Sequence, residues 1–270
     1  MKFFRISEAE TYPPNMKKLF LILSLAVLAL GIVPANAQFG PPGGGSRGPS
    51  FGGATGKLFG DNQSFSATLE FQTTDPSSNA ITMPGKISFD AGKSRFEMNM
   101  TEVKGGQMPP DAAAQMKSMG MDTMVSVSRP DKKTVYLIYP GLQSYVENPM
   151  PEKAAATGDD FKIETTEAGK ETMEGHDCVK NQVVVTDKDG KKHESTVWNA
   201  TDLKKFPVKI VTSEQGQNST MLFKKISFDK PAASNFEVPA SFQKYDNMQT
   251  MMQQQMMKRM GGGMVVPPGQ

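Results

Sequence analysis

Methionine is the residue type whose number and spacing first suggest chemistry in this sequence. The 270-residue chain contains 20 methionines, and most of those after the N-terminal region gather at residues 116–124 and 248–260, often three positions apart. Thioether sulfur is a soft ligand that selects Cu(I), and the same unbranched side chain also packs adaptably against apolar surfaces. The pattern therefore permits either a copper site or an apolar cover over a cavity. The candidate metal ligands are Met116, Met119, Met251 and Met252.

Other residue types offer less chemistry. His176 and Cys178 lie two positions apart, and His193 is the only other histidine. Structural zinc needs four ligands, so we expect a turn histidine and a half-buried thiol here. No nucleophile, base and orienting group occur together in a recognisable pattern, and we expect a protein that is not an enzyme and has no cofactor.

The N-terminal region has the pattern of a secretory signal peptide. Residues 16–18 read Met-Lys-Lys, an apolar run covers residues 19–33, and residues 35–37 read Ala-Asn-Ala. A basic N-terminal part, an apolar central part and small residues at the end are typical of a secretory signal peptide that is cleaved off. The apolar run is also shorter than the roughly 20 residues that cross a bilayer. We expect cleavage between Ala37 and Gln38, a periplasmic or secreted protein, and no transmembrane span in the mature chain.

The mature chain is formally neutral. The whole chain carries +2, and residues 1–37 account for this with four basic and two acidic side chains. Residues 1–15 lack the signal pattern, so we expect translation to start at Met16. Nucleic-acid binding relies on a basic surface that releases counterions, and a neutral chain argues against it. Cys178 is the only cysteine, so no internal disulfide forms. The sequence leaves open whether Cys178 bridges two chains, and we expect a monomer.

Alternating residues predict a sheet after a Gly- and Pro-rich start. Residues 38–62 are rich in Gly, Pro and Ser, and we expect a flexible leader there. From residue 63 to residue 243, short runs alternate between apolar and polar residues, as in Phe65, Ala67, Leu69 and Phe71. Such alternation is typical of antiparallel strands with one wet face. Short connections separate the runs, which predicts about eleven strands, nearly all antiparallel.

The clearest single element is a hairpin around Asp189-Gly190. This dipeptide accepts the positive φ angles of a two-residue type I′ loop. With that loop, Asn181 faces Trp198. We therefore predict that Trp198 shares the drier side of the hairpin with Val183 and Val185.

Two helices are expected. Prolines at positions 109 and 110 favour a helix start, and we expect either a short helix that runs through Met119 and stops at Gly120 or a mobile lid. Residues 244–260 contain no glycine or proline and place methionines at helical spacing, which predicts an amphipathic helix. Residues 261–270 are expected to form a tail.

A series of motifs runs through the second half of the chain. They are Glu171 to Cys178, the valines at 183–185, the turn at 189–190, Thr196 to Ala200, Phe206 to Lys209, and Ser234 to Pro239. These motifs resemble an exported bacterial family that carries a domain of unknown function, of the DUF4412 type, and the order of elements is also similar to the LolA/LolB-like lipoprotein-carrier scaffold. This resemblance implies an incomplete barrel of about eleven antiparallel strands, whose concave side is covered by helices. Its cavity would take a lipophilic small molecule or a lipoprotein acyl chain.

The leading hypothesis is a non-enzymatic periplasmic protein that holds or carries a lipophilic ligand under methionine-bearing helices. Cu(I) binding through the methionine clusters is an alternative, and a structural or interaction module of the cell envelope is another. The expected pocket residues are Phe71, Phe96, Met98, Trp198, Met248, Met252 and Met256.

Overall fold

A computed structural model describes residues 48–74, 78–105, 109–150, 160–214 and 217–261 of the chain. The predicted start at Met16, the signal peptide, residues 38–47 of the predicted leader and residues 262–270 of the predicted tail lie outside these described residues.

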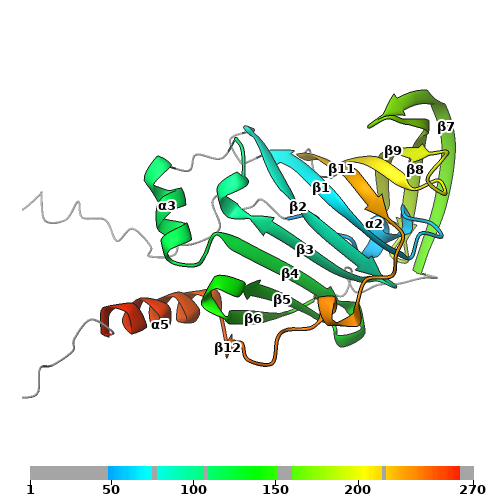
Figure 1. The fold of residues 1–270 in the computed structure, drawn as a ribbon. Helices are drawn as coiled ribbons and strands as arrows, with labels where there is room; N and C mark the ends of the chain where they lie inside the picture. Colours follow the sequence, from blue (N-terminus) through cyan, green and yellow to red (C-terminus); the bar gives the residue numbers. More distant parts are fainter. Residues whose placement is uncertain (1–47, 75–77, 106–108, 151–159, 215–216, 262–270) are drawn as a thin grey trace, which may run out of the picture. The chain divides into compact units, whose positions relative to one another are not determined.

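The described residues form one twelve-stranded sheet and three α-helices (Figure 1). The sheet order is β12-β6-β5-β4-β3-β2-β1-β11-β10-β9-β8-β7. The strands are β1 (Ser64–Thr74), β2 (Ala80–Asp90), β3 (Lys93–Asn99), β4 (Thr123–Arg129), β5 (Thr134–Tyr139), β6 (Ser144–Pro149), β7 (Phe161–Met173), β8 (His176–Asp187), β9 (Lys192–Ala200), β10 (Pro207–Glu214), β11 (Gln217–Ser227) and β12 (Gln243–Tyr245). The α-helices are α2 (Gly53–Lys57), α3 (Pro110–Ser118) and α5 (Met248–Gly261). Short 3₁₀ turns are η2 (Met100–Glu102), η3 (Pro130–Lys132), η4 (Pro140–Leu142) and η6 (Ala233–Phe236).

The predicted fold class is confirmed. Every pair of neighbouring strands is antiparallel except β12 and β6, which are parallel. The two end strands of the described sheet, β12 and β7, do not pair with each other, so the sheet is an incomplete barrel. One strand more than expected is present, because the three-residue β12 carries no alternation that a sequence pattern could reveal.

One face of the sheet, here called the inner face, carries the main core. Directly opposed residues on neighbouring strands point to the same side, and the register places Phe71 opposite Met83, Ile87 opposite Phe96, and Met98 opposite Met124. Gly85 sits within this face where a Cβ would come 2.6 Å from the Phe96 ring. The missing side chain at Gly85 therefore makes room for an aromatic ring on the neighbouring strand.

Phe59, just after α2, shows how the sheet curves. Its ring lies 5.0 to 5.9 Å from the rings of Phe65, Phe89, Phe206 and Phe223, which belong to or precede four different strands. The neighbouring α2 contacts β7 and β8. A single segment reaches strands from β2 to β7 only if the sheet wraps around it, so the inner face is concave, as the curling β7 to β9 end shows (Figure 1).

The prediction of a flexible leader over residues 38–62 is wrong for its second half. Phe51, Leu58 and Phe59 are 4%, 7% and 1% exposed and belong to the main core. The sequence did not indicate this burial, because the few apolar residues stand among glycines and form no periodic pattern. They fill the concave sheet without belonging to a strand.

The C-terminal helix covers the other end of the inner face. Met251 and Met252 of α5 pack with Tyr139, Val146 and Tyr245 from β5, β6 and β12. The helix begins at Met248, later than the predicted residue 244, because residues 243–245 pair with β6 as β12. The central helix α3 agrees closely with its predicted limits.

A separate small core lies on the outer face at β4. Val125 and Val127 oppose Glu97 and Arg95 of β3, so they point away from the inner face, and Phe236 of η6 covers them. Here the chain that returns from β11 to β12 is anchored.

Arg129 holds this returning chain. Its guanidinium is buried and donates hydrogen bonds to the Phe236 carbonyl (3.1 Å), to both carboxylate oxygens of Asp131 (2.9 and 2.7 Å) and to Glu237. The bond from Arg129 lowers the pKa of Asp131 from its ordinary 3.8 to about 2, and Arg129 also lowers the pKa of Glu237. Both carboxylates are half-exposed, so solvent weakens these ion pairs.

Acid should therefore loosen this anchor. A carboxylate whose pKa is lower in the folded state stabilises the fold above its ordinary pKa, and that contribution is lost as the pH falls toward the folded value. We expect the urea midpoint to fall between pH 4 and pH 2, and to fall less in the Asp131→Asn variant. Urea titrations at several pH values measure this, and equal slopes in both proteins would contradict it.

Candidate functional site

A groove lies on the inner face at the β7 to β9 end of the sheet. Its volume is about 550 Å³, within the range of about 300 to 1,000 Å³ typical of small-molecule sites. One wall is the segment that ends α2 and leads into β1, and the floor is formed by β7, β8 and β9. The lining residues are Lys57, Leu58, Phe59, Gly60, Asp61, Asn62, Ile163, Thr165, Glu167, Val179, Asn181, Val183, Val197, Asn199, Thr201, Lys204 and Lys205.

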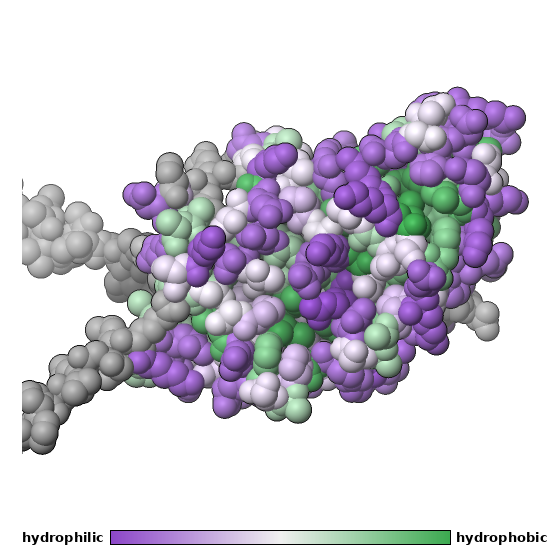
Figure 2. Space-filling view, in the orientation of Figure 1, coloured by the Kyte–Doolittle hydropathy of each residue, from purple (hydrophilic) through white to green (hydrophobic). Residues whose placement is uncertain are grey.

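The groove floor is apolar toward the β8–β9 hairpin. Ile163 of β7 opposes Val185 of β8, and Val183 is the next inward residue along β8. Val197 of β9 opposes Asn181. Val183 and Val197 are buried, but Ile163 is 49% exposed. Figure 2 shows hydrophobic atoms gathered beneath β7, β8 and β9, with hydrophilic residues along their border.

The opposite end of the groove, near the β9–β10 turn, is polar. The Asn181 amide donates to Asn199 (2.9 Å), and Asn199 donates to the Lys205 carbonyl (2.9 Å). The buried Asn62 donates to the Lys204 carbonyl (3.3 Å). Lys204 and Lys205 both have left-handed backbones, with φ of 53° and 56°. The amide side chains of Asn62 and Asn199 thus hold the backbone of this turn.

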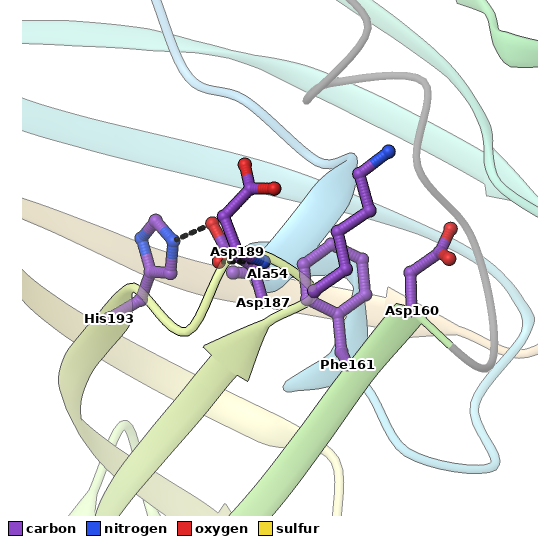
Figure 3. A pocket seen from close by; sticks show the side chains of 7 residues that line it. Ala54, Asp160, Phe161, Asp187, Asp189 and His193 are labelled. Atoms are coloured by element: carbon purple, nitrogen blue, oxygen red, sulfur yellow. Dashed lines mark hydrogen bonds and ion pairs between the residues drawn. The ribbon is translucent and has the colours of Figure 1, made fainter.

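A smaller cavity marks the hairpin end of the groove (Figure 3). Ala54 of α2 and Phe161 of β7 line it together with the loop that follows β8. His193 points toward Asp187, with 3.4 Å between Nε2 and Oδ2. The other Asp187 oxygen accepts hydrogen bonds from the backbone N–H groups of Asp189 (3.0 Å) and Lys191 (2.9 Å). Asp187 therefore stabilises the loop.

That loop has one residue more than predicted. The Gly190 N–H donates to the Asp187 carbonyl (2.9 Å), and Gly190 has a φ of 78° while Asp189 has no positive φ. This is a three-residue loop with glycine in the left-handed position, not a type I′ loop. The register is therefore shifted by one: Lys180, not Asn181, opposes Trp198.

The prediction that Trp198 lines the concave side is consequently wrong, since a shift of one residue turns a side chain to the other face. Trp198 lies on the outer face between the ammonium groups of Lys180 and Lys209, 5.1 and 4.7 Å from its ring centre. Its indole N–H donates to Glu171 (2.8 Å). Trp198 is an outer-face packing residue.

The remaining predicted pocket residues lie on the inner face or on α5, away from the groove. Phe71, Phe96 and Met98 are buried in the main core, at 3–4% exposure. On α5, Met252 is buried against the sheet, Met248 is half-buried, and Met256 is 49% exposed. The helices therefore fill this half of the concave side.

The methionine clusters meet, but in a different combination from the predicted copper ligands. Met121 and Met124 pack against the cluster that contains Met251 and Met252, whereas Met116 packs against the main core. The Met251 side chain is fully buried. This arrangement is that of a hydrophobic contact between α5 and the sheet.

The two other candidates have structural roles. His176 lies 2.7 Å from Asp202, and the buried Cys178 thiol donates to the His176 carbonyl at 3.4 Å. Burial raises the pKa of Cys178, which disfavours a reactive thiolate. Within the described residues, no group of three or more His, Cys, Asp or Glu side chains could hold a metal ion.

Sequence patterns missed most of β7, which forms part of the groove floor. Only Phe161 to Ile163 were predicted as a strand, yet β7 extends to Met173. Most of its residues are exposed on both faces, so no apolar alternation marks it. The apolar Ile163 among polar neighbours was the available signal.

Membrane-spanning helices are not found in the described part of the chain, where every helix is too short or too polar to cross a bilayer.

Comparisons with solved structures return distant likenesses. LprF from Mycobacterium bovis is 13% identical, with 70% of this chain and 95% of that chain covered and a TM-score of 0.39. Lipoprotein LppX from Mycobacterium tuberculosis is 13% identical, with 69% and 92% covered and a TM-score of 0.38. A LolA superfamily protein from Nitrosomonas europaea is 7% identical, with 68% and 94% covered and a TM-score of 0.36. Among curated proteins, no sequence matches the chain significantly.

The family assignment rests on a sequence match. The family model described as "Domain of unknown function (DUF4412)" matches residues 65–206, from β1 to the residue before β10. The match covers more than half of the chain and includes the three strands that form the groove floor. The chain therefore belongs to the DUF4412 family.

Proposed function

We propose that this protein is a non-enzymatic, exported protein that binds a lipophilic ligand, such as a lipid or an acyl chain, in the groove on the inner face of β7, β8 and β9. The observation that carries the proposal is the exposed apolar side chain of Ile163 in the groove floor. Ile163 is 49% exposed in a concave groove of about 550 Å³, although buried apolar side chains surround it. Exposed apolar surface inside a concavity is typical of a binding site.

The fold supports this proposal because the two ends of the concave side differ. At the β1 to β6 end, the core and α5 fill the space with Phe96, Met98 and Met252. At the β7 to β9 end, the short α2 segment leaves the floor partly uncovered. The ligand is therefore expected at the end away from the methionine-bearing helix.

Binding of the neutral lipophilic dye N-phenylnaphthylamine tests the proposal. We expect saturable fluorescence enhancement by the purified protein, and competition by acyl-chain compounds. Native mass spectrometry of the protein purified from bacterial membranes should show co-purifying lipid. Absence of both dye uptake and bound lipid would overturn the proposal.

Export is part of the same proposal. The signal pattern at residues 16–37 supports a mature chain that begins at Gln38 and resides in the periplasm or outside the cell. The intact mass of the protein recovered from a periplasmic extract should match residues 38–270, and recovery only of the uncleaved chain would contradict export.

A further inference from the structure

We infer that the groove selects single-chain amphiphiles with an anionic head group, and that the head lies near the β9–β10 turn while the chain extends toward the β8–β9 hairpin. This inference rests on the proposed lipid-binding function and adds the charge of the ligand and its direction in the groove.

The groove itself is amphipathic along its length. Ile163 and Val183 lie at the hairpin end, and Asn181, Asn199 and Thr201 follow toward the β9–β10 turn. An apolar chain is favoured over the first part because its burial removes apolar surface from water. A polar head is favoured over the second part because buried polar groups need hydrogen-bond partners.

Lysines outnumber acids in the lining. Lys57, Lys204 and Lys205 line the groove, against Asp61 and Glu167. None of these three lysines forms an ion pair with a carboxylate within the described residues. Hydrogen bonds between an ammonium group and an anionic oxygen are about twice as strong as neutral ones. Glu167 opposes Asn181 at the polar end, but the lining as a whole carries one more positive than negative side chain and therefore favours a negative head.

The two lysines of the turn are held in place. Consecutive left-handed residues usually include Asn or Gly, because a side chain makes this conformation unfavourable. Lys204 and Lys205 adopt it nevertheless, and Asn62 and Asn199 hold their carbonyl groups. The Lys204 ammonium lies over the Phe228 ring, 4.7 Å from its centre. Lys57 and Lys205 are thus the principal candidates for the head group.

Competition among three twelve-carbon amphiphiles tests the inference. Dodecanoate, dodecanol and dodecyltrimethylammonium displace N-phenylnaphthylamine from the full mature chain at concentrations below micelle formation. We expect dodecanoate to bind at least about ten-fold more tightly than the cation, with dodecanol between them. Inorganic phosphate alone should not displace the dye, because the chain supplies the apolar part of the binding.

A pair of double variants locates the head group. Lys57→Gln with Lys205→Gln should reduce the preference for dodecanoate over dodecanol about five-fold or more. Lys162→Gln with Lys192→Gln removes the same charge from two exposed lysines. Both oppose Thr186 of β8, Lys162 from β7 and Lys192 from β9, and therefore point to the outer face. This control should keep the full preference.

The outcomes separate the two proposals. Equal affinity for all three amphiphiles, displacement by phosphate alone, or an equal loss in both double variants would overturn the anionic-head inference while lipid binding stands. Failure of the dye itself to bind would overturn the proposed function and this inference together.

Discussion

The Ile163→Glu variant is expected to lose at least about ten-fold in affinity for N-phenylnaphthylamine, which corresponds to about 1.4 kcal/mol. Ile163 contributes the most exposed apolar surface of the groove floor. A carboxylate at this position is hydrated in the empty groove. An apolar ligand would remove that water, and the cost of removing it weakens binding. Because β7 is an edge strand of the described sheet, the fold should tolerate the change.

A matched variant on the same strand controls for the added charge. Thr166 opposes Gln182 and points to the outer face, whereas Ile163 points into the groove. Thr166→Glu should bind the dye like the unmodified protein. Dye titrations of both variants, together with circular dichroism spectra, provide the measurement. Equal affinities in the two variants would place the ligand outside this groove.

The Phe65→Ala variant is expected to lower the free energy of unfolding by about 3–5 kcal/mol. The Phe65 side chain is fully buried, and its ring lies 5.0 Å from Phe59, 5.3 Å from Phe89 and 4.8 Å from Phe206. These contacts join α2, β2 and the start of β10. Alanine would leave a cavity at the point where the sheet curves around the α2 segment.

Urea unfolding followed by circular dichroism measures this loss. Phe228→Ala is a suitable comparison, since its half-buried ring makes one ring contact within the described residues, to Phe206 at 5.8 Å. We expect a clearly smaller loss there. A loss below about 1 kcal/mol for Phe65→Ala, typical of surface positions, would show that the α2 segment does not depend on this cluster.

The strand pattern of this protein follows from its sequence. Alternating residues in β1 gave the correct faces, because a strand with one wet side must alternate. The limits of α3 were also predictable, since proline begins a helix and glycine ends it through local backbone preferences. The curled sheet and the family were indicated by motifs spread over β8, β9 and β10.

The site could not be predicted in the same way. The Asp189-Gly190 turn accommodates both a two-residue and a three-residue loop, and the choice reverses the face of Trp198. Phe59 belongs to the core only because four distant strands supply aromatic partners. The face of the sheet to which Ile163 points depends on the pairing of β7 with β8, where Ile163 opposes Val185.

By itself, the sequence determined most of the strands, the two longer helices and the signal pattern, because each depends on neighbours within a few positions along the chain; β12 and most of β7 were the exceptions. Only the tertiary structure decided where the concave side is filled and where it stays open, because this depends on which distant side chains compete for the same space. Packing placed α5 over β5, β6 and β12 and left the floor formed by β7, β8 and β9 partly uncovered.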